Sequence, residues 1–164
     1  MILASHILVG AAVATSFVNP ISGVFFAFLS HFVLDRIPHW EYSVDPLKQI
    51  KTRGVRYCLP ILRRVFLDFA LGYALLTLAI ALATQRIAWD TALFGGFSGI
   101  LPDGMTFLLF LWRGKKGVIS TVLKLHYILH VNMHFSKEKG LPPLHVGLST
   151  QGIAILLALY FLIF

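Results

Sequence analysis

Hydropathy divides the chain into five apolar segments separated by two polar stretches. The apolar segments cover residues 2–18, 21–34, 65–83, 88–112 and 146–164. An α-helix needs ~20 residues to cross the hydrocarbon core of a bilayer, so all but the short second segment are long enough or nearly so. No strand-like alternation competes with this pattern. We therefore predict an all-α integral membrane protein, a single transmembrane domain over residues 1–164 with a bundle of about five transmembrane helices.

The two polar stretches contain helix signals of their own. Asp45-Pro46 is typical of a helix start, because aspartate caps a first turn and proline fits its first position. A short interfacial helix to about Lys51 follows from this. Residues 118–135 are rich in Leu, Val and Ile and predict a His-rich helix on the cytoplasmic side, ended by the Gly and Pro residues after it. This helix can lie on the membrane surface or dip into the bundle.

Composition supports the membrane interpretation and accounts for the net charge of +7. The chain is 57% hydrophobic and only 13% charged. Of its 14 Lys and Arg residues, seven lie in residues 36–64 and six in residues 113–139. By the positive-inside rule both stretches are cytoplasmic, and the N-terminus with them. We expect the membrane to be of the prokaryotic inner-membrane type. Topology and contact with anionic lipid explain the charge, so we expect no nucleic-acid partner.

This topology brings all seven histidines and three aspartates to one side of the membrane. His31 and Asp35 are one helical turn apart, and Pro38 can direct His39 back to the same face. The histidines of the polar helix follow one another at the same spacing. Nine residues form the predicted set of metal ligands: His6, His31, Asp35, His39, Asp68, Asp103, His126, His130 and His134.

The residue types in this set favour a metal centre. Imidazole nitrogens and carboxylate oxygens are ligands for Zn²⁺, Mn²⁺ and Fe²⁺, and a lone cysteine excludes a Cys-rich site. An aspartate facing only lipid costs ~2.5–3.5 kcal/mol on insertion scales, so the aspartates need partners. We predict one or two divalent ions, with zinc preferred over manganese or iron. Asp35, Asp68 and Asp103 are the predicted catalytic residues of a metal-assisted hydrolysis.

Two of these aspartates can also serve purely structural roles. Asp68 is one turn after Arg64 and can form a salt bridge with it. Asp103 follows Pro102, which predicts an irregularity in the fourth apolar helix, and it can serve there as a turn residue. Three glycines lie just before this irregularity and allow close approach of another helix: Gly95, Gly96 and Gly99.

Several short motifs resemble the membrane-bound metal-dependent hydrolases, a group that includes the LexA-binding inner-membrane-associated hydrolases. The motifs are Ser5-His6, the run His31-Phe-Val-Leu-Asp35-Arg-Ile-Pro-His39, and Leu101-Pro102-Asp103. The resemblance implies a small helical membrane protein with a His/Asp metal centre that hydrolyses a lipid-like or phosphoester substrate. It places ligands at His6, His31, Asp35, His39, Asp103, His130 and His134. The sequence Leu34-Asp35-Arg36-Ile37-Pro38-His39 has one aspartate fewer than many members have at this point.

We therefore expect an enzyme, a metal-dependent hydrolase of phosphoester or ester bonds in a lipid-like substrate at the cytoplasmic membrane face. Three other classes of membrane protein remain open. Histidines on two helices can ligate haem for electron transfer. Intramembrane His and Asp also mark the paths of metal or proton transporters. In the third class, the His/Asp set binds a metal for stability alone.

Overall fold

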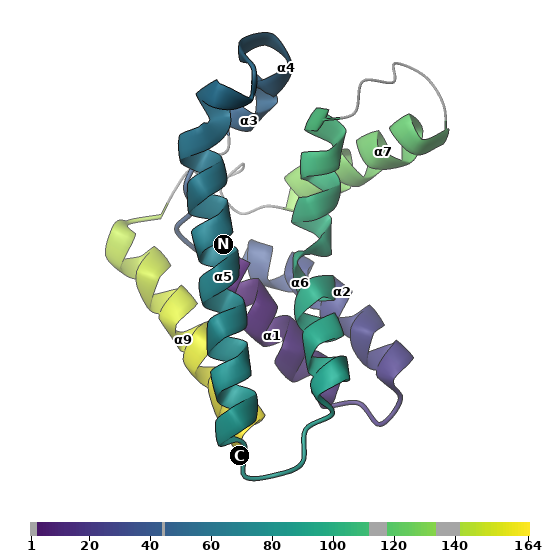
Figure 1. The fold of residues 1–164 in the computed structure, drawn as a ribbon, viewed down its shortest axis with the longest axis vertical. Helices are drawn as coiled ribbons and strands as arrows, with labels where there is room; N and C mark the ends of the chain where they lie inside the picture. The colour runs from purple at the N-terminus through teal and green to yellow at the C-terminus, as the bar shows by residue number, and fades with distance from the viewer. Residues whose placement is uncertain (1–2, 44, 112–117, 134–141) are drawn as a thin grey trace.

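A computed structural model describes residues 3–43, 45–111, 118–133 and 142–164, without side chains at 110, 118 and 129–133. The described residues form helices and no strands, which confirms the all-α part of the predicted fold class (Figure 1). The helices are α1 (Leu3–Thr15), α2 (Pro20–Arg36), α3 (Asp45–Lys48), α4 (Ile50–Arg53), α5 (Val55–Leu82), α6 (Trp89–Leu111), α7 (Val118–Met133) and α9 (Leu144–Ile163).

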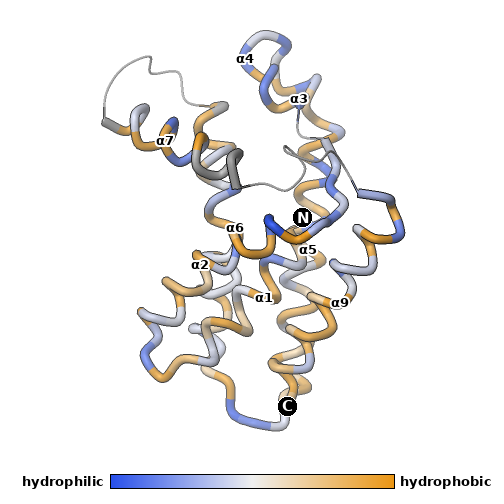
Figure 2. The backbone as a smooth tube through the Cα atoms, turned by 180° about the vertical axis from the view of Figure 1, so that it is seen from behind, coloured by the Kyte–Doolittle hydropathy of each residue, from blue (hydrophilic) through white to orange (hydrophobic). Residues whose placement is uncertain are grey.

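Three of these helices, α5, α6 and α9, are long and apolar enough to cross a membrane. Hydrophilic residues gather at the α3–α4 end of the molecule and in the link between α5 and α6 (Figure 2). Helices α1 and α2 have 13 and 17 residues. At 1.5 Å per residue they are roughly 20 and 26 Å long, shorter than the ~30 Å hydrocarbon core. That all five helices cross the membrane stays a prediction.

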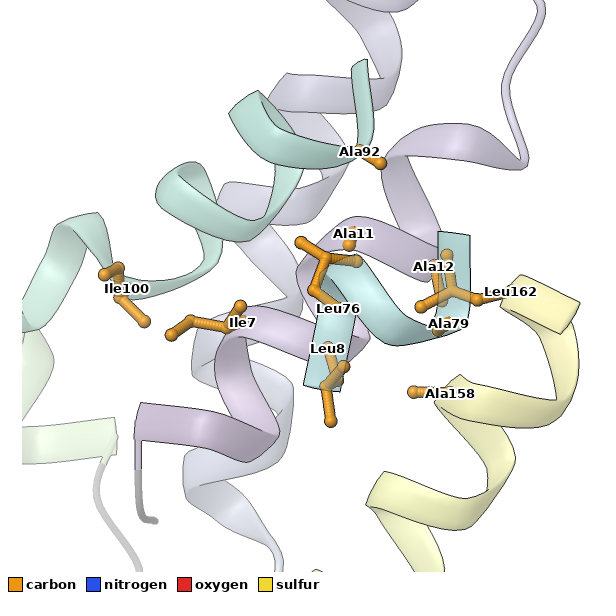
Figure 3. Packing of buried hydrophobic residues seen from close by; sticks show 10 residues of the cluster. All are labelled: Ile7, Leu8, Ala11, Ala12, Leu76, Ala79, Ala92, Ile100, Ala158 and Leu162. Carbon is orange, nitrogen blue, oxygen red and sulfur yellow. The ribbon is translucent and has the colours of Figure 1, made fainter. Parts of the chain in front are cut away.

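Helix α1 lies in the middle of the bundle and contacts α2, α5, α6 and α9. Its residues are small or apolar on almost every side, which is typical of a helix that is buried all round. Ile7 and Leu8 are fully buried and pack with Leu76 of α5 and Leu162 of α9 (Figure 3). This cluster joins the first helix of the chain to the last.

Glycines bring α1 and α6 into direct backbone contact, as their position in the sequence predicted. A Cβ on Gly99 would lie 2.4 Å from the His6 carbonyl oxygen, and one on Gly10 would lie 2.6 Å from the Gly95 carbonyl oxygen. Gly95 and Gly99 are four residues apart, so both face α1. The close approach places His6 beside α6.

Helix α5 begins ten residues before the apolar segment predicted for it. Helices α3 and α4 pack against its first turns. Leu47 and Ile50 contact Cys58 and Ile61 of α5 in a second apolar cluster. Together with α7, these elements form one end of the molecule (Figure 1). Asp68 consequently lies near the middle of α5 rather than near its start.

The turns at the opposite end are satisfied by side chains. The Asn19 side chain accepts hydrogen bonds from the backbone N–H groups of Ile21 and Ser22, with Pro20 at the first helical position. Thr84 and Gln85 donate to the last carbonyls of α9, at Ile163 and Phe164. These bonds fix the bundle at the end away from Asp35, Asp68 and Asp103.

Candidate metal centre

His6, His31 and Asp35 meet between α1 and α2. One ligand atom from each lies within 4.8 Å of the other two, so the group could hold a metal ion. All three side chains are buried, with at most 1% of each residue exposed. Asp35 is the shared neighbour, because its Oδ1 lies 3.3 Å from His6 Nε2 and its Oδ2 lies 3.1 Å from His31 Nε2.

The backbone of α6 orients His31. Its Nδ1 lies 2.7 Å from the Gly99 carbonyl oxygen, which can only accept a hydrogen bond. Nδ1 therefore carries a proton, and in the neutral ring Nε2 presents a lone pair to Asp35. A backbone carbonyl that fixes the tautomer in this way is the usual outer partner of a metal-ligating histidine.

The contacts of Asp35 fit a cation. A lone pair on His31 Nε2 and a carboxylate oxygen 3.1 Å away repel each other unless a proton or a metal ion lies between them. Both ring nitrogens of His6 are buried without a hydrogen bond among the described residues. Two ligand atoms at ~2.0–2.1 Å from a tetrahedral zinc ion are roughly 3.3 Å apart. The two histidines contact different oxygens of Asp35 at 3.3 and 3.1 Å, and one ligand atom from each residue lies within 4.8 Å of the others. The donor set therefore fits a divalent metal.

The two histidine rings approach the aspartate from the same side. Their centroids are 4.1 Å apart and their planes meet at 25°, so the rings are stacked. His31 is one helical turn before Asp35 on α2, whereas His6 belongs to α1. The stacked rings therefore bring together histidines from two different helices.

Asp103 forms the open edge of this group. Its Oδ1 lies 3.8 Å from His31 Nε2, and its side chain is 36% exposed while that of His31 is fully buried. It is one residue after Pro102, whose missing N–H leaves the Ser98 carbonyl without its helical donor. Asp103 is thus a partly exposed carboxylate beside the buried group of His6, His31 and Asp35.

Asp68 has a different set of partners. Its oxygens accept hydrogen bonds from the backbone N–H groups of Leu3, at 2.6 Å, and Ala4, at 3.2 Å, and from the Tyr42 hydroxyl at 3.2 Å. The carboxylate caps the start of α1 and does not pair with Arg64. We therefore leave Asp68 out of the proposed metal centre, although its sequence position predicted a ligand and catalytic residue.

His39 is buried in the segment after α2, outside the group of three. Its Nδ1 donates to the Ile37 carbonyl oxygen at 2.6 Å, and its Nε2 lies 3.9 Å from Glu41 Oε2. The segment is attached to α9, because Thr150 donates to the Pro38 carbonyl and Gln151 to the Trp40 carbonyl. Pro38 lies just after the end of α2, and among the described residues His39 does not belong to the group formed by His6, His31 and Asp35.

The predicted histidine stripe lies only partly within the described structure. His126 is buried, and its Nε2 donates to the Pro102 carbonyl oxygen at 2.9 Å, which docks α7 on α6. Its ring lies 6.3 Å from that of Phe32, which in turn is 5.6 Å from the ring of His31. The side chain of His130 and the whole of His134 lie outside the described residues.

Three positioning features were missed by the sequence reasoning. The Gly99 carbonyl was missed because backbone acceptors leave no residue-type signal. The attachment of residues 38–40 by Thr150 and Gln151 left a weak signal, since these residues belong to the polar run Ser149-Thr150-Gln151 in a largely apolar segment. The capping of α1 by Asp68 was missed because the sequence does not show that the start of α1 lies beside the middle of α5.

Comparisons of the chain with models of protein families, with curated proteins and with solved structures find no match. The resemblance to membrane-bound metal-dependent hydrolases therefore stays a prediction from the motifs. Any function assigned to the chain has to rest on the geometry of the site.

Proposed function

We propose that the protein is a metal-dependent membrane hydrolase whose metal is held by His6, His31 and Asp35. The observation that carries this proposal is the convergence of two imidazole nitrogens and a carboxylate within 4.8 Å, next to a partly exposed second carboxylate. Three protein ligands with an open neighbouring position are typical of catalytic zinc sites, whereas structural sites are closed by four. Zinc fits the His/Asp ligands best, with manganese or iron as alternatives.

The substrate of this hydrolase is a lipid-like molecule with a phosphoester or ester bond. A metal bound here would lower the pKa of a water molecule and polarise the phosphoryl or carbonyl oxygen. Asp103 takes a proton from the attacking water and passes it to the departing oxygen. The phosphorus–oxygen or acyl carbon–oxygen bond breaks, one water is consumed, and an acid and an alcohol are released. The Gly99 carbonyl holds His31 in position, and His6 of α1 contacts Asp35.

The stacked histidines favour this metal site over the haem alternative. Axial histidines bind a haem iron from opposite faces of the porphyrin. Here the rings of His6 and His31 are 4.1 Å apart and direct their Nε2 atoms to the same carboxylate. The complete burial of the three ligands favours instead a purely structural metal, which is the second candidate.

The test separates metal binding from catalysis. Purified wild-type protein is assayed for bound metal by elemental mass spectrometry, and for hydrolysis of a bacterial lipid extract by lipid mass spectrometry. We expect Asp103→Asn to keep the metal and lose hydrolysis, and Asp35→Asn to lose both. Asp90→Asn, the same change at the exposed start of α6, is the matched control and should keep both.

Two outcomes decide between the candidates. Wild-type protein with no more divalent metal than Asp35→Asn overturns the metal centre. Wild-type protein that binds metal but hydrolyses no lipid, with or without added zinc, overturns the hydrolase and leaves the structural metal.

A further inference from the structure

An apolar groove lies between α1, the end of α2 and α9. Its volume is about 470 Å³. This value falls within the ~300–1,000 Å³ of typical ligand sites. Apart from Ser16 and Thr150, its lining consists of aliphatic and aromatic side chains. The groove therefore suits a hydrocarbon and offers little to a polar ligand.

One end of the groove adjoins the segment that carries Asp35. Leu34 and Ile37, on either side of Asp35 in the sequence, line the groove together with Thr150. From Thr150 the lining continues along α9 to Phe161, eleven residues further on. At 1.5 Å per residue this is roughly 16 Å, about half of the ~30 Å hydrocarbon core. The groove has the length of one bilayer leaflet.

The groove is held in place at this end. Thr150 Oγ1 donates to the Pro38 carbonyl oxygen at 2.5 Å, and Gln151 donates to the Trp40 carbonyl oxygen. A Cβ on Gly147 would lie 2.5 Å from the Trp40 backbone nitrogen, so glycine permits the contact. These contacts fix the segment after α2 against α9, which sets the separation of the groove walls.

We propose that this groove binds one acyl chain of an anionic membrane lipid, with the head group at the end of α2. The proposal rests on the proposed function, because it names the substrate class of the same centre. Ile153, Leu157 and Phe161 line the groove and are each more than half exposed on a candidate membrane span. The groove is thus continuous with the apolar surface of α9, where lipid chains are the surrounding solvent.

The charge near the α2 end selects an anionic head group. Arg36 is the last residue of α2 and is exposed, directly before Ile37 of the lining. A basic side chain at a membrane surface attracts anionic lipid by ~1 kcal/mol. An apolar helix from a second copy of the chain would fill the groove but would not use this charge.

The test fills the groove and measures bound lipid. Detergent-purified protein is mixed with dipalmitoyl phosphatidylglycerol and examined by native mass spectrometry. Ala154→Trp places a large ring in the groove, and Leu157→Trp does so from a more exposed position that tolerates the ring better. Leu156→Trp, on α9 but outside the lining, is the matched control. We expect both groove variants to bind the lipid about tenfold more weakly and the control to bind it normally.

Metal content is measured on the same samples, so that the two proposals can fail separately. Normal lipid binding by Ala154→Trp and Leu157→Trp overturns the groove, whatever the metal does. Loss of a dimer in the groove variants, with unchanged lipid binding, assigns the groove to a second copy and also overturns it. If both variants lose lipid binding and the wild-type protein carries no metal, the result supports the groove and overturns the proposed hydrolase.

Discussion

Asp35 and Asp68 are two aspartates on apolar helices whose surroundings differ in one respect. Within the described part of the chain, Asp68 accepts hydrogen bonds from three donors, the N–H groups of Leu3 and Ala4 and the hydroxyl of Tyr42. Asp35 faces two histidine nitrogens, one of which presents a lone pair when the ring is neutral. A carboxylate surrounded by donors is satisfied by the protein, whereas one facing lone pairs needs a cation. The partners of an aspartate on an apolar helix, more than its presence there, indicate whether it can bind a metal.

The largest effect should follow from neutralising Asp35. Asp35→Asn removes the charge and replaces one oxygen ligand with an amide, so bound metal should fall by roughly 100-fold or more. Elemental mass spectrometry of purified protein measures this. Retention of wild-type metal by the variant would show that the two aspartates do not differ in the way proposed.

The same substitution at Asp68 should affect stability and not metal. In Asp68→Asn the amide group faces donors and can accept at only one atom, so unfolding free energy should fall by about 1–3 kcal/mol. Thermal unfolding in detergent, followed by tryptophan fluorescence, measures the loss. A fall in metal content without a fall in unfolding temperature would instead return Asp68 to the metal centre.

A substitution at Gly99 of α6 should weaken the proposed metal centre, because Gly99 contacts both His6 and His31. Gly99→Ala puts a Cβ 2.4 Å from the His6 carbonyl oxygen, which must push α1 away and disturb the acceptor of His31. We expect a loss of about 1–3 kcal/mol in stability together with weaker metal binding.

Gly104 offers the control for that change. It lies on the same helix, and a Cβ there would meet nothing within 4 Å. Gly104→Ala should leave metal content unchanged and leave stability equal or slightly higher, because alanine favours helix. Equal effects of the two substitutions would mean that close approach of α1 and α6 does not support the site.

Replacing His126 tests whether this residue is a ligand of the proposed metal centre. His126→Phe removes the hydrogen bond to the Pro102 carbonyl and should cost about 0.5–1.5 kcal/mol of stability. Metal content should stay at the wild-type level, because His126 docks α7 rather than ligating. A loss of metal as large as that in Asp35→Asn would make His126 a ligand.

The smallest effect on stability should come from Tyr42, whose hydroxyl donates to Asp68. Burial, and after it the neighbouring Asp68 carboxylate, raise the pKa of the Tyr42 hydroxyl. A group with a raised pKa in the folded state contributes stability below its unfolded pKa of ~10 and loses it as pH rises further. Tyr42→Phe should therefore lower stability by about 0.5–1.5 kcal/mol near neutral pH and flatten its decline above pH ~10. Unfolding temperatures across this pH range measure both, and an unchanged decline would exclude Tyr42 as its source.

The helices were predictable because apolar runs, Asn19, Pro20 and the glycines of α6 are local signals. Within the described residues, the 88–112 and 118–135 predictions cover α6 (Trp89–Leu111) and α7 (Val118–Met133). The predicted topology, with the one-turn spacing of His31 and Asp35, placed His6, His31 and Asp35 in a set of nine residues, and these three meet in the structure. What sequence could not supply was the partner of each ionisable group. Asp68 and His126 have backbone partners, and a backbone group at one position has the same chemistry as at any other.

All three proposed ligands come from the hairpin that α1 and α2 form. His6 and Asp35 are separated by fewer than thirty residues, so a metal here would close a short loop of chain. During synthesis this hairpin is complete before α5, α6 and α9 exist. The later helices then supply the Gly99 carbonyl, the Asp103 carboxylate and the cap on α1. The later helices are thus synthesised after the three proposed ligands, and they orient and bury these ligands.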